Sequence, residues 1–300
     1  MINGILIINK EKGYTSHDVV AKMRGILKIK KIGHTGTLDP DAEGVLPICI
    51  GKATKLVDMI TDKNKTYDTV LKLGITTDTQ DLTGSVIKTG EVTSTWEEIE
   101  DAINSFIGEY MQLPPMYSAV KVNGKKLYEL ARQGIEVERK RRQVIIHDIK
   151  ITAYSAVDQE VSLTVDCGKG TYIRTLLNDI GDKLGCGGAM KSLLRTRVGS
   201  FTIDQAFTLS EIEEFKDQGK LMEYIVPIDD MFVDYEKLIV AREFHKLIYN
   251  GNSFKREHVI KSPQTFLKGL VRVYDSDDKF IGIYQYDEMK QLYKPVKMFN

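Results

Sequence analysis

The residues best suited to chemistry lie in one short segment, residues 33–47, which reads GHTGTLDPDAEGVLP. Its glycines and prolines predict a loop with several unusual backbone angles, and such a loop can hold a side chain rigidly. Asp39 precedes Pro40, which favours an extended backbone at the aspartate. Its carboxylate is therefore a candidate for chemistry on a fixed loop, although an Asp-Pro pair in a loop is by itself more often a turn cap.

Two more carboxylates, Asp41 and Glu43, follow in the same segment. Glycoside cleavage also attacks an anomeric carbon with paired carboxylates, so a hydrolase that uses these residues is an alternative. It requires two carboxylates that face each other across a substrate, which closeness in sequence does not ensure. A nucleotide-binding loop at residues 185–192 is excluded, because Met190 stands where a P-loop needs glycine before lysine.

Apolar periodicity predicts the elements that hold this loop. A short strand covers residues 5–8, and a helix capped by Ser16 follows it. Residues 45–50 form a buried strand, and residues 66–75 alternate as a strand with Tyr67 on its more apolar face. The loop is thus expected between a helix and a strand of the core.

The remaining pattern mixes strands with single helices. Ser94 and Glu97 form a possible capping box for a helix, strands are predicted at residues 143–153 and 160–167, and residues 171–184 are in helical phase. Because strands and helices do not alternate strictly, the pattern favours a mixed α/β or α+β domain over a doubly wound parallel sheet.

The 300 residues exceed the commonest size of one domain, so one large and one small domain are expected. Past Pro227 the chain changes to short strand-like runs separated by Gly and Asp. We divide it into a core, residues 1–230, and a small, mainly β domain, residues 231–300.

Charge does not by itself predict a nucleic-acid-binding protein, because 42 basic and 42 acidic residues give a formal net charge of zero. Basic residues nevertheless cluster at residues 24–31, 139–142 and 191–197, and acidic residues at 97–101 and 211–217. Such segregation can produce a basic face on a neutral protein. Each run alone is more often solvated surface, so composition makes RNA binding a minority interpretation.

The three cysteines, Cys49, Cys167 and Cys186, show no CxxC spacing, and we expect reduced thiols that mostly pack in the core. No stretch approaches the roughly 20 apolar residues of a membrane helix. Residues 1–10 lack the basic start and long apolar run of a signal peptide. We therefore expect a soluble cytoplasmic protein that does not engage a membrane.

Four segments match the motifs of one known family in the family's order: residues 15–20, 33–51, 115–132 and 168–174. In them the chain resembles the bacterial-type tRNA pseudouridine synthases of the TruB family. The third segment resembles the strand and helix that follow the family's RNA-gripping insertion, and the fourth its GTYIR segment. One departure is Glu11, which follows Lys10 where the family usually has proline.

The resemblance implies isomerisation of uridine to pseudouridine at position 55, in the T loop of tRNA. The reaction breaks the bond from ribose C1′ to N1, turns the uracil and reattaches it through C5. Asp39 is then the nucleophile, and the sequence leaves open whether its adduct forms at C1′ or at C6. Neither route needs a metal or a redox cofactor.

Several partners of Asp39 can be named. Arg174 is the residue expected beside it, because a guanidinium favours the ionised carboxylate and can hold it bidentately. By resemblance, Tyr67 stacks on the target base and takes part in removing the C5 proton, and Tyr172 lies in the uracil pocket. His34 matches the residue that fills the gap left by the flipped base.

Other expectations concern RNA binding. Lys10, Lys191 and Arg195 are placed with the substrate-binding residues, and the run at 139–142 is expected to contact phosphates. The resemblance further implies a mainly antiparallel core of pseudouridine synthase type with an RNA-gripping insertion, and a PUA-like RNA-binding domain at the C-terminal end. We expect a monomer that binds the T stem-loop of tRNA without an obligatory protein partner. A noncatalytic RNA chaperone is the second alternative.

Overall fold

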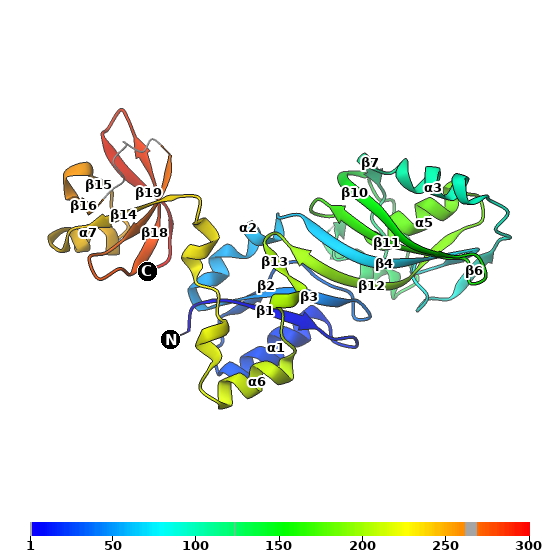
Figure 1. Cartoon of the computed structure of the whole chain (residues 1–300), viewed down its shortest axis with the longest axis horizontal. Helices are drawn as coiled ribbons and strands as arrows, with labels where there is room; N and C mark the ends of the chain where they lie inside the picture. The colour runs from blue at the N-terminus through cyan, green and yellow to red at the C-terminus, as the bar shows by residue number, and fades with distance from the viewer. Residues whose placement is uncertain (1, 123, 262–268) are drawn as a thin grey trace.

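A nine-stranded sheet forms the larger part of the computed structural model, which describes residues 2–122, 124–261 and 269–300 (Figure 1). Its strands are β1 (Gly4–Lys10), β2 (Ile32–His34), β3 (Glu43–Ile50), β4 (Lys65–Leu73), β7 (Gly108–Gln112), β10 (Arg142–Ser155), β11 (Glu160–Cys167), β12 (Gly188–Val198) and β13 (Phe201–Thr202). The order is β1-β3-β12-β4-β11-β10-β7, with β2 beside β3 and β13 beside β12. The predicted mixed, mainly antiparallel α+β fold is confirmed.

One pair of strands differs from the others. β3 and β12 run parallel and are joined by two residue pairs, Glu43 with Leu194 and Gly44 with Arg195, whereas the other paired strands of this sheet within the described residues are antiparallel. Gly44 has a φ of 104°, and a Cβ there would lie 2.2 Å from the carbonyl oxygen of Arg195. A glycine is therefore required for these two strands to meet.

Helices cover the sheet in two groups. They are α1 (Ser16–Leu27), α2 (Val57–Thr61), α3 (Trp96–Asn104), α5 (Ile173–Lys183) and α6 (Leu209–Asp217), and a 3₁₀ turn at Gly51–Leu56 precedes α2. α1 and α6 share a buried cluster with β1 and β3, in which Leu6, Met23, Ile48 and Ile212 are fully or nearly fully buried. This cluster supports one side of the 33–47 loop.

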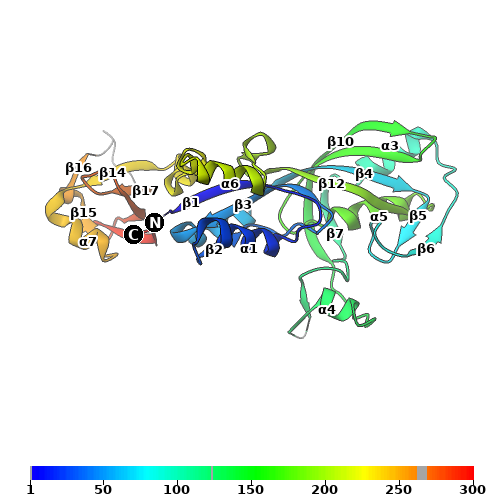
Figure 2. The same cartoon turned by 90° about the horizontal axis from the view of Figure 1, so that it is seen from below.

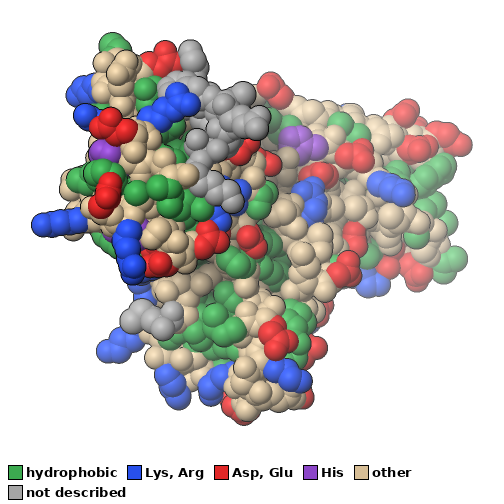
Figure 3. Space-filling view, turned by 60° about the vertical axis from the view of Figure 1, so that its left-hand side comes forward, with side chains coloured by type: hydrophobic (Ala, Val, Ile, Leu, Met, Phe, Trp, Pro, Cys, Tyr) green, Lys and Arg blue, Asp and Glu red, His purple; other side chains and the backbone are tan. Residues whose placement is uncertain are grey.

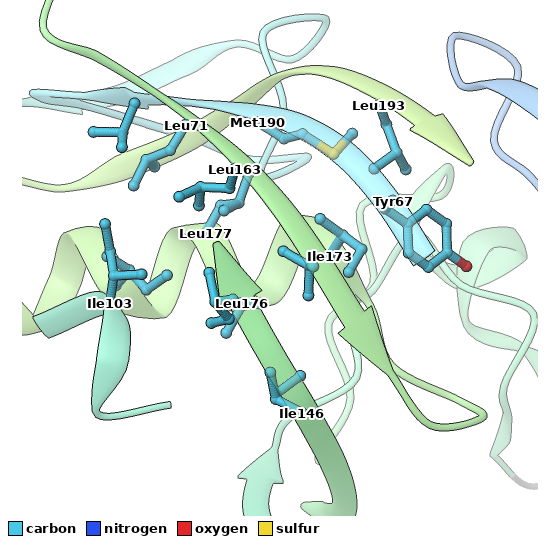
Figure 4. Packing of buried hydrophobic residues seen from close by; sticks show 14 of the residues in the cluster. Tyr67, Leu71, Ile103, Ile146, Leu163, Ile173, Leu176, Leu177, Met190 and Leu193 are labelled. Carbon is cyan, nitrogen blue, oxygen red and sulfur yellow. The ribbon is translucent and has the colours of Figure 1, made fainter. Parts of the chain in front are cut away.

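The second cluster supports the other side. α3 and α5 pack against β4, β10, β11 and β12 through buried apolar side chains such as Leu71, Leu163 and Leu177 (Figure 4). Tyr67 lies at the edge of this cluster, and its hydroxyl points away from the packed side chains (Figure 4). The amphipathic pattern of residues 66–75 thus continues to the edge of the apolar core.

Both predicted N-caps are wrong by one residue. The cap of α1 is Thr15, which forms a capping box with Asp18, and the cap of α3 is Thr95, which does so with Glu98. Adjacent Ser and Thr residues have equivalent capping chemistry, so the sequence alone did not separate them. The Ser16 side chain does not cap α1 and instead forms a hydrogen bond with the 33–47 loop.

An insertion, residues 113–141, leaves the sheet between β7 and β10 and projects away from it (Figure 2). It contains a hairpin of β8 (Lys121–Val122) and β9 (Lys125–Lys126), followed by the short helix α4 (Leu127–Ala131). The strand and helix expected after an insertion are therefore inside it. Asn123 of the matching segment is outside the described residues.

The C-terminal part is a second, six-stranded sheet, which confirms its predicted β character. It consists of β14 (Glu236–Val240), β15 (Phe254–Lys255), β16 (Val259–Lys261), β17 (Leu270–Tyr274), β18 (Phe280–Asp287) and β19 (Leu292–Met298), with the helix α7 (His245–Tyr249). Phe232 and Phe299 share one buried cluster with Ile5 of the large sheet. The division at residue 230 stays a prediction, because this cluster spans it.

Three further expectations concern the whole chain. All three cysteines are buried and free. In the residues that the structure describes, none of the helices is both long and apolar enough to cross a membrane. Basic and acidic side chains both appear on the face shown in Figure 3, so that face does not form a single basic field.

Candidate active site

A pocket of about 540 Å³ lies where the 33–47 loop, β4, the start of α5 and the insertion meet. Five of the eight predicted site residues line it, and they are Asp39, Tyr67, Tyr172, Arg174 and Arg195. The remaining lining residues are Gly36, Thr37, Leu38, Thr61, Asp62, Lys65, Tyr117, Ser118, Ala119, Arg142, Gln143, Val144, Gly168, Lys169, Gly170, Thr171, Ile173 and Leu193. Residues from six separate stretches of sequence thus converge on one cavity.

Asp39 and Arg174 form an ion pair in this pocket, with Nε of Arg174 3.1 Å from Oδ2 of Asp39. The arginine side chain is only 6% exposed, whereas 41% of the aspartate side chain remains open to the pocket. The predicted partnership between these residues is confirmed. The carboxylate is held on one side and accessible to a substrate on the other.

Arg174 is itself fixed by several acceptors. Nη1 donates to the carbonyl of Thr79 at 3.1 Å and lies 3.4 Å from Oδ2 of Asp81, and Nη2 donates to the carbonyl of Tyr117 at 2.9 Å. The guanidinium therefore has a defined plane and direction, which a lysine could not provide with one nitrogen.

Asp81 is a site residue that the sequence analysis missed. Its carboxylate also accepts hydrogen bonds from the hydroxyl of Thr79 and from the backbone amide of Thr83, so it is itself well ordered. The segment 78–84, DTQDLTG, contains the Asp, Thr and Gly residues of a hydrogen-bonded turn, and that composition was the available signal.

Burial and neighbouring charges shift the pKa of the Asp39 carboxyl in opposite directions. Desolvation raises the pKa of the Asp39 carboxyl, and the carboxylates of Asp81 and Asp41 act in the same direction, whereas Arg174 and Lys10 lower it. Removing either cation would therefore make the carboxyl harder to ionise.

Two buried side chains hold the loop from behind. The hydroxyl of Ser16 accepts a hydrogen bond from the amide of Leu38 at 2.9 Å. The ammonium of Lys10 is completely buried and donates to the carbonyls of Glu11, Tyr14 and Pro40. Ser16 and Lys10 thus hold Leu38 and Pro40, the residues on either side of Asp39 in the sequence. Lys10 was expected to contact the substrate, but it does not line the pocket, so its position argues against that expectation.

Three tyrosines line the pocket, and two of them, Tyr67 and Tyr172, were predicted from the sequence. Tyr67 is 8% exposed and lies between Val165 and Arg195 on the neighbouring strands. Burial raises the pKa of its hydroxyl, and Arg195 opposes that shift. Tyr172 stands at the N-cap of α5, and burial raises the pKa of its hydroxyl as well.

Arg195 occupies a different place from the one expected of a phosphate-binding residue. It is 1% exposed, and its guanidinium donates to the carbonyls of Val45 at 2.7 Å and Gly36 at 3.2 Å. A side chain so enclosed joins β3, the 33–47 loop and β12, but has no open surface for a phosphate. The sequence could not separate it from the exposed basic residues of the same strand.

The two other predicted residues lie outside the pocket lining. His34, on β2, has a buried Nδ1 without a hydrogen-bond partner, and its ring centre lies 5.2 Å from that of His17. Burial first, and then the charges of His17 and Arg195, lower the pKa of His34. Lys191, on β12, forms an ion pair with Glu160 at 2.7 Å.

The hydrolase alternative loses both carboxylates that were considered as partners of Asp39. Asp41 and Glu43 are both exposed and neither lines the pocket that contains Asp39. The pocket contains Arg174, Tyr67 and Tyr172 instead, which that alternative does not use.

Comparison with known proteins identifies the family of this chain. The model of the TruB family pseudouridylate synthase (N terminal domain) matches residues 24–173, and that of the tRNA pseudouridylate synthase B C-terminal domain matches residues 174–233. The chain belongs to the TruB family. The first of these matches spans the 33–47 loop, the insertion and the pocket residues up to Ile173.

Similarity to TruB relatives extends over the full chain. A tRNA pseudouridine synthase B of Lachnoclostridium phytofermentans is 52% identical, with 99% of this chain and 100% of the relative covered. The protein of the same name in Bacillus subtilis is 43% identical, with 99% and 98% covered. A chain of the Cbf5-Nop10-Gar1 complex, known from a crystal structure, gives a TM-score of 0.70 at 25% identity, with 99% and 85% covered.

Proposed function

We propose that this chain isomerises uridine to pseudouridine at position 55, in the T loop of tRNA, with Asp39 as the nucleophile on a flipped-out base. The observation that carries the proposal is the ion pair of Asp39 with Arg174, 3.1 Å apart, in a pocket whose lining includes Tyr67 and Tyr172. The substrate assignment is supported by relatives named tRNA pseudouridine synthase B.

The chemistry requires an ionised carboxylate near the ribose or the uracil ring. Attack by Asp39 at C1′ displaces the uracil anion, and attack at C6 forms a ring adduct that also weakens the bond from C1′ to N1. In either route C5 then bonds to C1′, the bond between Asp39 and the substrate breaks and frees the carboxylate, the C5 proton leaves, and N1 takes up a proton. Arg174 favours the attacking form of Asp39 and holds its direction.

The aromatic residues suit a base that has left its stack. Tyr67 offers a ring face for stacking, and its hydroxyl lies at the open edge of the apolar core (Figure 4). Tyr172 closes the pocket from the start of α5. His34 would fill the gap in the RNA, outside the pocket, which fits its position on β2.

We further propose that the insertion, the run at residues 139–142, Lys191 and the C-terminal module, residues 231–300, bind tRNA. Arg195 and Lys10 act through the catalytic loop instead of contacting phosphates, because both are buried. The enzyme would work as a cytoplasmic monomer, without an obligatory protein partner and without a metal or redox cofactor.

The test uses an unmodified tRNA transcript. Purified protein is incubated with it, and pseudouridine is mapped by carbodiimide modification and primer extension. A single stop in the T loop, absent with Asp39→Ala, is expected. Modification elsewhere would contradict the substrate assignment, and release of free uracil would support the hydrolase. A chaperone would keep its only activity in Asp39→Ala.

A further inference from the structure

Gln112 is the last residue of β7, directly before the insertion, and it is 1% exposed. Its side-chain amide meets the backbone of one residue at both ends. Oε1 accepts from the amide of Tyr172 at 2.8 Å, and Nε2 donates to the carbonyl of Tyr172 at 2.9 Å. A buried amide is costly unless both its polar groups are paired, and here the backbone N–H and C=O of one residue pair with them.

This double contact falls at the start of the helix that carries the catalytic arginine. Tyr172 is the N-cap of α5, and its own side chain makes no capping hydrogen bond. Arg174 follows two residues later, and its Nε must remain beside Asp39. Gln112 therefore fixes the position of the backbone from which both the pocket tyrosine and the arginine project.

A second contact at the start of α5 comes from the insertion itself. The carbonyl of Tyr117, within the insertion, accepts a hydrogen bond from Nη2 of Arg174 at 2.9 Å. The base of the insertion is thus tied to the backbone of α5, and its interior to the arginine side chain. A shift of the insertion relative to the sheet would disturb both contacts.

We propose that Gln112 is a positioning residue of the reaction, which couples the base of the insertion to the orientation of Arg174 against Asp39. This inference rests on the proposed function and assigns Gln112 no contact with the substrate. Misplacement of a reacting group by about 1 Å can cost roughly a hundredfold in rate. The effect of losing Gln112 should therefore appear in the chemical step and not in tRNA affinity.

Two variants separate positioning from simple stability. Gln112→Met keeps the approximate volume and removes both hydrogen bonds, and should lower the single-turnover rate by about 30- to 100-fold while the Kd for tRNA transcript stays within about threefold. Gln112→Glu keeps the acceptor but, when ionised, loses the donor. Protonation restores an O–H donor, so its rate relative to wild type at the same pH should rise as the pH falls from about 8 to about 6.

Gln218→Met is the matched control, because Gln218 is exposed at the C-terminal end of α6 and its side chain bonds only with Glu214 among the contacts that the structure describes. It should retain the wild-type rate and Kd. Should Gln112→Met fail to fold, the pH trend of Gln112→Glu still decides. A loss confined to Kd, a rate equal to the control, or a flat pH ratio overturns the proposal. An inactive wild-type chain overturns the proposed function as well.

Discussion

Nε of Arg174 lies 3.1 Å from Oδ2 of Asp39, and the same guanidinium reaches Oδ2 of Asp81 at 3.4 Å, so one cation is shared by two carboxylates. Asp39 is the partner that stays accessible, with 41% of its side chain exposed against 14% for Asp81. The arrangement leaves one carboxylate available to react while the other orients the arginine. The first two predictions test this division of roles.

Asp39→Asn should remove the isomerisation almost completely, by about 10⁴-fold or more, because the amide is a poor nucleophile of nearly the same size. Binding of tRNA should remain within a few-fold of wild type. Tritium release from tRNA labelled at uracil C5 measures the rate, and filter binding measures the Kd. Asp41→Asn, an exposed aspartate two residues away, is the control and should stay active. Equal losses in both variants would contradict the role of Asp39.

Arg174→Met should shift the pH dependence as well as lower the rate. The reaction needs ionised Asp39, whose pKa desolvation raises and Arg174 lowers. Without the guanidinium the pKa rises further, so the acid limb of the single-turnover profile should move to higher pH. Arg174→Lys should move it less because the charge remains. Lys216→Met, which removes an exposed cation of α6, should leave the limb in place, and an unmoved limb in Arg174→Met would contradict the pairing.

Lys10 should leave a signature in stability against pH. Burial lowers the pKa of its ammonium from 10.5 to about 8. Between about pH 8 and pH 10.5 the unfolded chain binds this proton and the folded chain does not, so the free energy of unfolding gains a contribution that rises with pH. Lys10→Met lacks that gain. The unfolding free energy of the wild type minus that of the variant, measured in urea, should therefore increase over this range. A constant difference would contradict the burial of the charge.

Gly44→Ala should destabilise the protein by about 3 kcal/mol, because the added Cβ meets the Arg195 carbonyl and the residue must keep a positive φ. Gly219→Ala separates these causes. Gly219 also has a positive φ, of 74°, but a Cβ there meets nothing within 4 Å. It should cost clearly less, about 1 kcal/mol. Equal losses in chemical denaturation would show that backbone strain alone explains Gly44.

The sequence alone predicted those parts of the fold and the site that depend on the local residue pattern or on the order of the motifs. Apolar alternation predicted the strand that carries Tyr67, and helical phase predicted the helix that carries Arg174. The fixed loop around Asp39 followed from its glycines and prolines. These residues meet because the elements that carry them end at one edge of the pocket, and the motif order was the only advance indication of that.

Other features depend on which face of an element a side chain occupies. Arg195 and Lys191 are four residues apart on one strand, yet the first is enclosed and the second is ion-paired at the surface. Lys10 similarly reads as a surface cation until its three carbonyl partners are known. Asp81 was missed because its role comes from a tertiary contact with Arg174, and no local spacing predicts that contact.

The short parallel pairing of Gly44 with Arg195 has a mechanical consequence. Long antiparallel ladders resist bending, whereas these two residue pairs form only a short line between the two halves of the sheet. Asp39 lies five residues before this line on one half, and Tyr67 lies opposite Arg195 on the other. Points near an axis move least, so a rotation of one half against the other about this line would displace Asp39 and Tyr67 less than the far ends of the sheet.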